Sequence, residues 1–229
     1  MVTYFHLAPP NDDRLIAKPM RGVPAPMLDV YPCPISANCF KHIDGCRRVG
    51  ELAQEVDHND RDQLVIWSAP GSQGGCLVHE GLLEEFGKCG LTGYRAQPAT
   101  LRFQDGTVTR EYRELVVTGW GGMAHPASGI RVVEECPSCR WKRYSALRCP
   151  ELLVDWKQST GEDFFIVWPL PGYTLITGRV ANLLMSRNVR SFELGGLEGA
   201  GISGFSVVRL SSFLPLDLAL KFGAPLGLE

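Results

Sequence analysis

Two cysteines with the spacing of metal ligands are the residues of this 229-residue chain that point most directly to chemistry. Cys136 and Cys139 enclose a Pro-Ser pair, and two thiolates separated by two residues in a tight turn form half of a tetrahedral zinc site. A complete site needs two further ligands. The candidates are Cys33 and Cys39, with Cys46, Cys149 or a histidine as substitutes. Zinc is therefore the cofactor that this cysteine set would hold.

The cysteine usage as a whole indicates a reducing compartment. The chain has eight cysteines, but disulfide frameworks belong mainly to short secreted domains. Its start, M-V-T-Y-F-H-L-A-P-P, lacks the basic and apolar regions of a secretory signal. The longest uncharged apolar run, 164–178, contains two prolines and is too short to span a membrane. Cys76 and Cys89 accompany an apolar helical pattern, which predicts that both are buried. We expect a cytoplasmic protein with no membrane partner.

The cysteine pair lies among predicted strands. Strand composition bounded by turn residues occurs at Leu64–Trp67, Tyr94–Phe103, Tyr112–Thr118, Gly129–Glu135, Phe164–Trp168 and Phe205–Leu210. The Asp105-Gly106 pair predicts a hairpin turn. These patterns predict a main domain over residues 64–229 that carries a cysteine knuckle at 136–149.

Residues 1–63 have a different composition. Seven prolines, at positions 9, 10, 19, 24, 26, 32 and 34, exclude regular helix from this part of the chain. Only one strand is expected, at Val2–Leu7. We therefore expect an irregular, Pro-rich N-terminal arm that packs on the main domain.

Two segments of the main domain match each other at an offset of 98 residues, 77–96 and 175–194. Their apolar positions coincide, and each predicts a short strand, an amphipathic helix of about three turns, a C-cap at Gly90 or Asn188, and a second strand. Chance is the alternative, because any strand–helix–strand unit shares this period. A pseudo-duplicated unit predicts an α+β fold in which two helices pack on a mixed, mainly antiparallel sheet.

Composition and motifs count against catalysis and against general nucleic-acid binding. A net charge of −2 is unlike the strongly basic balance of most nucleic-acid binders. The chain has no G-x-S-x-G elbow, no H-E-x-x-H motif and no Walker loop. We therefore expect a protein that is not an enzyme.

One basic stretch supports an alternative function. Residues 136–149 contain Arg140, Lys142, Arg143 and Arg148, with Trp141 and Tyr144 between them. Basic and aromatic residues on a zinc knuckle would suit single-stranded nucleic acid, through phosphate contacts and base stacking. The other interpretation is that these residues form a basic turn whose charge balances that of the acidic stretch 51–62. The net charge of the whole chain favours this second interpretation.

Two further segments carry a resemblance to a known family. Glu114–Met123, E-L-V-V-T-G-W-G-G-M, and Asp163–Pro171, D-F-F-I-V-W-P-L-P, resemble the double-CXXCG motif proteins, and the likeness covers roughly residues 64–229. In this chain Arg140 stands where the family has glycine. Cys33-Pro-Ile-Ser36 keeps the first thiol of the other motif and has serine in place of the second.

The resemblance implies a function by binding. The family includes myxobacterial immunity proteins, so the chain is expected to bind a cognate toxin and to cover its active site. If that toxin is a nuclease, the acidic run with Asp57, Asp60 and Asp62 would imitate a nucleic-acid backbone. The alternative function, based on the basic stretch, is that of a zinc-knuckle protein that binds nucleic acid or acts as a regulatory protein.

Overall fold

The computed structural model describes residues 4–12, 15–23, 27–29, 33, 35, 47–68, 75–189, 192–195, 197, 206–207 and 209–228. Within them the chain is mixed α+β, as predicted, with mostly strands and few helices. The α-helices are α1 (Glu80–Lys88), α2 (Gly178–Ser186) and α3 (Leu216–Gly223). Short 3₁₀ turns occur at η3 (Pro126–Ser128), η4 (Pro150–Leu152), η6 (Leu210–Ser212) and η7 (Ala224–Leu226). No helix among these residues is long and apolar enough to cross a membrane.

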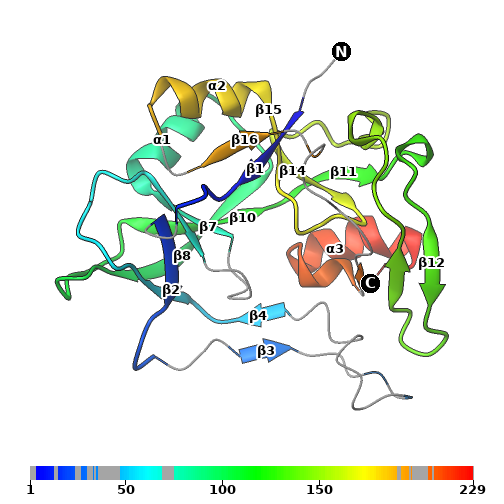
Figure 1. Cartoon of the computed structure of the whole chain (residues 1–229), viewed down its shortest axis with the longest axis horizontal. Helices are drawn as coiled ribbons and strands as arrows, with labels where there is room; N and C mark the ends of the chain where they lie inside the picture. The colour runs from blue at the N-terminus through cyan, green and yellow to red at the C-terminus, as the bar shows by residue number, and fades with distance from the viewer. Residues whose placement is uncertain are drawn as a thin grey trace.

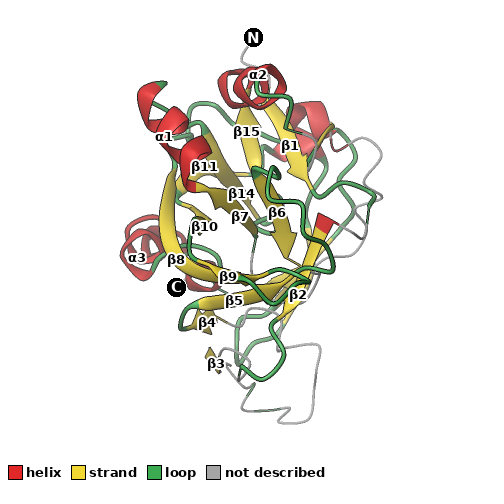
Figure 2. Ribbon diagram, turned by 90° about the vertical axis from the view of Figure 1, so that its left-hand side faces the viewer, coloured by secondary structure: helices red, strands yellow, loops and turns green. Residues whose placement is uncertain are grey.

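Six strands close into a barrel, which is seen in the lower part of Figure 2. In order around the barrel they are β2 (Ile16–Pro19), β6 (Val65–Ser68), β7 (Cys76–His79), β10 (Tyr112–Val117), β8 (Tyr94–Arg102) and β5 (Leu52–Glu55). β10 pairs with β7 and β8, and β5 pairs with β2 and β8, so no edge remains between them. β9 (Val108–Thr109) extends β8 through the Asp105-Gly106 hairpin turn that the sequence predicts.

The interior of the barrel is a packed apolar core. One side chain in two along each strand points inward, as the pleat of a strand requires. The inward-facing residues form a single buried cluster: Ala17, Leu52, Val56, Ile66, Leu77, Ala99, Leu101, Phe103 and Tyr112. Burial of this apolar surface fixes the register of the strands, because a shift by one residue would turn the cluster outward.

A second sheet stays open. Its order is β11 (Gly119–Met123), β14 (Phe164–Trp168), β15 (Leu175–Thr177), β1 (Tyr4–Ala8) and β16 (Glu193–Gly195). The pairing of β11 with β14 is parallel and the other three are antiparallel. The five barrel strands β2-β6-β7-β10-β8 repeat this order, again with one parallel pairing followed by three antiparallel ones.

The two sheets share one core beneath α1 and α2, which lie together at the top of Figure 1. The C-caps are Cys89 and Arg187, one residue before the predicted caps, and the predicted residues follow them in left-handed conformation, Gly90 with φ of 61° and Asn188 with φ of 50°. The segments 77–96 and 175–194 both fold as strand–helix–strand units. The shared core combines Leu82 and Phe86 of α1 with Val180, Ala181 and Leu184 of α2, among others.

Two small hairpin sheets lie outside these layers. β3 (Met27–Asp29) pairs with β4 (Arg47–Val49), and β12 (Val132–Glu135) pairs with β13 (Lys142–Tyr144), which also pairs with β17 (Ser206–Val207). Each hairpin stands in the connection between the two parallel strands of a sheet. β3 and β4 lie between β2 and β6 in sequence, whereas β12 and β13 lie between β11 and β14.

Three features of the fold differ from the sequence prediction. The expected irregular N-terminal arm contributes β1, β2 and β5 to the sheets, because Pro9 and Pro10 follow β1 and Pro19 is the last residue of β2. The single sheet is in fact a closed barrel plus an open sheet, and strand periodicity carries no information about closure. The C-terminal helix α3 was missed; it begins after Pro215, and a stacked Phe222–Trp120 pair packs it on the second sheet.

Candidate metal centre

Three cysteines from distant parts of the chain meet at the hairpin β12–β13. The Sγ atoms of Cys33, Cys136 and Cys139 all lie within 4.8 Å of one another. The Sγ atoms of Cys33 and Cys136 are 3.9 Å apart although 103 residues separate them in sequence. Three thiol sulfurs at such distances can hold a metal ion, as the sequence predicted for these residues.

The backbone around Cys136 forms a tight turn. The amide of Cys136 donates to the carbonyl of Trp141 at 2.8 Å, and the amide of Arg140 donates to the carbonyl of Cys136 at 3.0 Å. To close this turn Arg140 adopts a left-handed conformation, with φ of 60°. Glycine is the residue best suited to that conformation. This explains why a Cys-x-x-Cys-Gly motif has glycine at this position, and here Arg140 adopts the same backbone geometry.

The two thiols of the turn differ in acidity. Amide N–H groups of Cys139 and Ser138 lower the pKa of Cys136, because they donate hydrogen bonds to its sulfur. Burial raises the pKa of Cys139 to about 11. A metal ion binds thiolates, so its arrival would displace the proton that burial keeps on Cys139. The turn therefore offers one favoured thiolate and a second that forms with the metal.

Two cysteines of the cluster are buried, and Cys139 is half-buried. Cys33 and Cys136 are 3% and 8% exposed, and Trp141, which packs against them, is 3% exposed. Structural zinc sites are closed by protein ligands, whereas catalytic sites keep a position open to water. The burial of these sulfurs matches the closed type.

The other cysteines take several positions. Cys39 and Cys46, two candidates for a fourth ligand, lie outside the described residues. Cys149 is a free, half-buried thiol that does not belong to the cluster. Cys76 is buried in the core as predicted, and burial raises its pKa to about 12. The prediction for Cys89 was wrong, because this residue is the exposed C-cap of α1.

The aromatic residues of the basic stretch do not face solvent. Trp141 and Tyr144 are 3% and 5% exposed, and the hydroxyl of Tyr144 accepts a hydrogen bond from the indole N–H of Trp168. Lys142 and Arg143 form ion pairs across the hairpin with Glu135 and Glu134, at 3.5 Å and 3.0 Å. Neither aromatic ring is placed to stack on a base, and two of the cations already face carboxylates.

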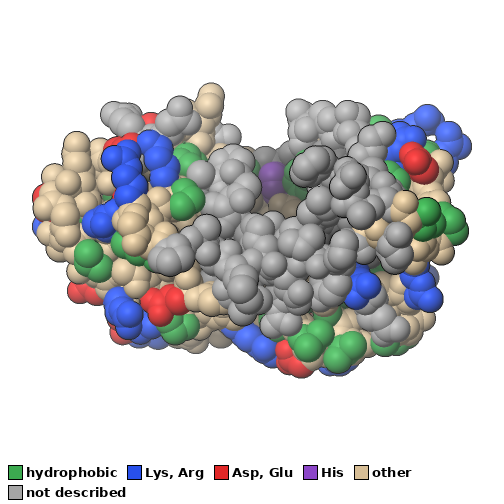
Figure 3. All heavy atoms as spheres, turned by 90° about the horizontal axis from the view of Figure 1, so that it is seen from below, with side chains coloured by type: hydrophobic (Ala, Val, Ile, Leu, Met, Phe, Trp, Pro, Cys, Tyr) green, Lys and Arg blue, Asp and Glu red, His purple; other side chains and the backbone are tan. Residues whose placement is uncertain are grey.

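The acidic residues lie on the loop between β5 and β6 and are exposed. Asp57 pairs with Lys18, which lowers its pKa by a hydrogen bond and by charge. Asp60 accepts from the side chain of Gln63 at 2.6 Å and from the amide of Asp62 at 3.0 Å, and these bonds lower its pKa. Two of the three carboxylates therefore stabilise the loop itself. Positive and negative side chains are also interspersed where Figure 3 shows described residues.

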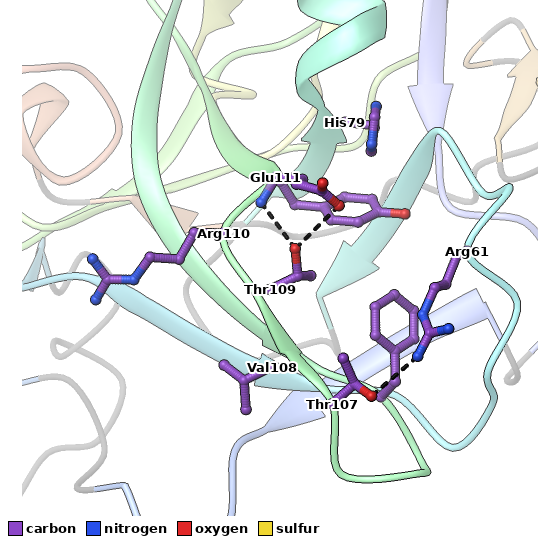
Figure 4. Close-up of a pocket in the computed structure, with 9 residues that line it drawn as sticks. Arg61, His79, Thr107, Val108, Thr109, Arg110 and Glu111 are labelled. Carbon is purple, nitrogen blue, oxygen red and sulfur yellow. Dashed lines mark hydrogen bonds between the residues drawn. The ribbon is translucent and has the colours of Figure 1, made fainter.

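Sequence reasoning missed a pocket of about 310 Å³ at the end of the barrel (Figure 4). Its floor includes Tyr112, whose hydroxyl donates to the carbonyl of Gln63 at 2.7 Å, and burial raises the pKa of Tyr112 to about 12. Arg61 bridges Asp105 and Thr107 at 2.8 Å and 3.1 Å. Arg110 points away from Thr109 in Figure 4. The polar groups at this mouth mainly hydrogen-bond to one another, and the Asp-Gly hairpin was its only signal in the sequence.

The segments Glu114–Met123 and Asp163–Pro171 are neighbours in the fold. β11 from the first pairs with β14 from the second, Gly119 opposite Phe165 and Trp120 opposite Ile166. A Cβ on Gly119 would stand 2.1 Å from the carbonyl oxygen of Phe164, so only glycine fits there. No protein-family model matches the chain, and no curated protein matches its sequence.

Proposed function

We propose that this chain is an immunity protein that binds a cognate bacterial toxin domain and blocks its active site by covering it. The observation that carries the proposal is the contact between Cys33 and Cys136. It joins the remnant of the first cysteine motif to the second, as a protein built on a double motif requires. The resemblance of Glu114–Met123 and Asp163–Pro171 to immunity proteins supplies the partner.

The cysteine cluster has a structural role in this proposal. Cys33, Cys136 and Cys139 would hold the zinc ion, and Cys39, which lies outside the described residues, is the proposed fourth ligand. The metal supplies no reaction step. It would join the tip of the β12–β13 hairpin to the connection between β2 and β6, two parts of the chain whose described residues share a small apolar cluster there.

Zinc binding is tested by metal content. Purified protein is expected to hold about one zinc ion, and Co²⁺ in its place is expected to give thiolate charge-transfer and tetrahedral absorption bands. Cys136→Ser and Cys139→Ser should each lose the metal. Cys89→Ser is the matched control, because this exposed cysteine lies outside the cluster. A metal-free wild-type protein, or equal loss in the control, would contradict the zinc assignment.

Inhibition by occlusion requires no chemistry from the chain. A stable interface of this kind buries about 1,600 Å² in total and depends on a few anchor residues. The toxin acts inside the cell, so the protein would bind it in the cytoplasm. If the toxin is a nuclease, the loop with Asp57, Asp60 and Asp62 would enter its nucleic-acid site. Charge reversal of all three that leaves protection intact would rule out this part of the proposal.

The decisive experiment is growth of a bacterial host that expresses the toxin domain encoded beside this gene, with and without the chain. We expect rescue, together with a complex that co-purifies. Continued killing by the toxin while the chain is folded would overturn the proposal. Binding of the isolated chain to single-stranded RNA or DNA, weakened by salt, would favour the nucleic-acid alternative instead.

A further inference from the structure

Arg140 occupies a backbone position that suits glycine better than arginine. Its backbone closes the cysteine turn with φ of 60°, a conformation that glycine adopts without steric cost. The side chain of Arg140 is exposed, and its Nη1 atom lies near Gly227. A Cβ built on Gly227 would stand 3.9 Å from that nitrogen. Residues held in unfavourable backbone conformations cluster at functional sites, which directs attention to the side chain.

The cation of Arg140 is not neutralised within the described part of the chain. No carboxylate lies within ion-pair distance of it there, and the same holds for Arg131 and Arg148, which are also exposed. Lys142 and Arg143 on the same hairpin do have carboxylate partners. Among the described residues, Arg131, Arg140 and Arg148 thus carry positive charge without a carboxylate partner around the β12–β13 hairpin.

Apolar side chains accompany these arginines. Val132 and Val133 are 46% and 45% exposed, and every residue of β12 faces solvent. β12 lies at the right-hand edge of the molecule in Figure 1, far from the barrel strands. We call Arg131, Val132, Val133, Arg140 and Arg148 the hairpin surface. Arginine is enriched in protein–protein interfaces, and it forms paired hydrogen bonds with carboxylates.

We propose that the hairpin surface is where this protein contacts its toxin, and that it binds an acidic patch on that partner. The inference rests on the immunity function proposed above and names the contact surface for it. A protein is favoured over a nucleic acid because Trp141 and Tyr144 are buried, which leaves aliphatic rather than stacking groups beside the cations.

The test compares two double variants with the same chemical changes. Val133→Glu with Arg140→Glu alters the hairpin surface. Val108→Glu with Arg110→Glu alters the far end of the barrel, where Val108 is 55% exposed and the Arg110 side chain 73% exposed. Binding of each purified variant to the toxin domain encoded beside this gene is measured by calorimetry, and folding by circular dichroism.

We expect the hairpin variant to bind at least about tenfold more weakly, as loss of an anchor does, and the barrel variant to bind like the wild type. Arg140→Gly should also weaken binding while it retains the turn, which separates the cation from the fold. If the wild type binds and neither hairpin change matters, this inference fails and the immunity function stands. If the wild type neither binds nor rescues, the immunity function fails and the inference falls with it.

A nucleic-acid outcome is tested in the same series. The wild type is titrated with a fluorescent single-stranded 20-nucleotide DNA and its RNA counterpart at low salt. Binding that disappears in the hairpin variant but not in the barrel variant would show that the surface serves nucleic acid, and would overturn the choice of an acidic protein.

Discussion

The two halves of this molecule have the same strand order but different closure. The strand order of the first half is β2-β6-β7-β10-β8, and that of the second half is β11-β14-β15-β1-β16. In both, the first pair of neighbouring strands is parallel and the next three pairs are antiparallel. Among the described residues, only the first half has an additional strand, β5, which joins β2 to β8 and completes a barrel. The barrel is therefore the five-stranded arrangement found in both halves plus one further strand.

The same face of the unit is buried in two ways. Ile66 and Leu77 point into the barrel. Phe165 and Leu175, at the matching places of the second half, are covered by Leu153, Val154 and Leu197 from outside the sheet. A sheet can bury its apolar face by closing into a barrel or by packing against connecting segments, and this chain does both.

Each half also contains a strand from the other. β1 precedes β2 in sequence but pairs with β15 and β16, whereas β10 precedes β11 but pairs with β7 and β8. The cysteines follow the same symmetry, because Cys33 lies between β2 and β6 and Cys136 between β11 and β14. With strands exchanged, neither half can complete its sheet alone, so unfolding should be one cooperative transition.

The largest expected effect comes from matched cavities in the two halves. Leu77→Ala and Leu175→Ala remove the same atoms at equivalent places, and both side chains are at most 1% exposed. We expect Leu77→Ala to lower the free energy of unfolding by about 3–5 kcal/mol and Leu175→Ala by about 2–3 kcal/mol, since loops collapse into a cavity more easily than a closed barrel does.

Urea denaturation followed by tryptophan fluorescence and circular dichroism measures both values. The two probes should give coincident curves for each variant. A larger loss in Leu175→Ala would reverse the argument about closure. Separate transitions for the two probes would show that the halves unfold independently despite the exchanged strands.

A smaller effect is expected at the polar link between the halves. Asp163 is 3% exposed and accepts from the Thr177 hydroxyl at 2.7 Å, from Arg179 at 3.0 Å and from the Thr92 amide at 3.1 Å. It thus ties the loop after α1 to the start of α2. Asp163→Ala should lower stability by about 2–3 kcal/mol, because it leaves buried donors without an acceptor.

The control for this link is a surface ion pair. Glu84 faces Lys88 at 3.7 Å on α1 with both side chains more than two-thirds exposed, so Glu84→Ala should cost no more than about 0.5 kcal/mol. Both variants are compared in the same urea titration. Equal losses would mean that Asp163 contributes no more than an exposed carboxylate, and that the halves are joined by apolar packing alone.

Local patterns allowed the elements to be predicted far better than their assembly. Phe164–Trp168 was predicted with its observed bounds, and the ends of α1 and α2 were predicted to within one residue by Gly90 and Asn188, because both signals depend on residues that are neighbours in sequence. The closed barrel and the exchanged strands depend on which strands pair across long sequence separations, and the residues near each strand in sequence carry no information about that pairing. Prolines misled the N-terminal prediction, because Pro9 and Pro10 follow a strand and Pro19 ends one, so that prolines do not exclude strands between them.

In the candidate site, too, local features could be predicted from the sequence and features of the assembled fold could not. Cys136 and Cys139 were identified from their spacing, and Cys33 from the remnant of a motif, whereas the burial of Trp141 and the pairing of Lys142 and Arg143 are properties of the folded hairpin. The basic stretch therefore suggested nucleic acid in the sequence, whereas in the described part of the folded chain Lys142 and Arg143 pair with carboxylates and Arg140 and Arg148 do not.

The smallest expected effect compares the two helix caps. Gly90 and Asn188 hold equivalent left-handed positions, and an added Cβ at Gly90 would meet no atom within 4 Å. Gly90→Ala should therefore cost about 1 kcal/mol from backbone conformation alone, and Asn188→Gly should gain about 0.5 kcal/mol or less. Thermal denaturation of both variants measures the difference. Opposite signs would show that the repeated units share their cap geometry in solution, whereas a loss in both would mean that the Asn188 side chain stabilises its own cap.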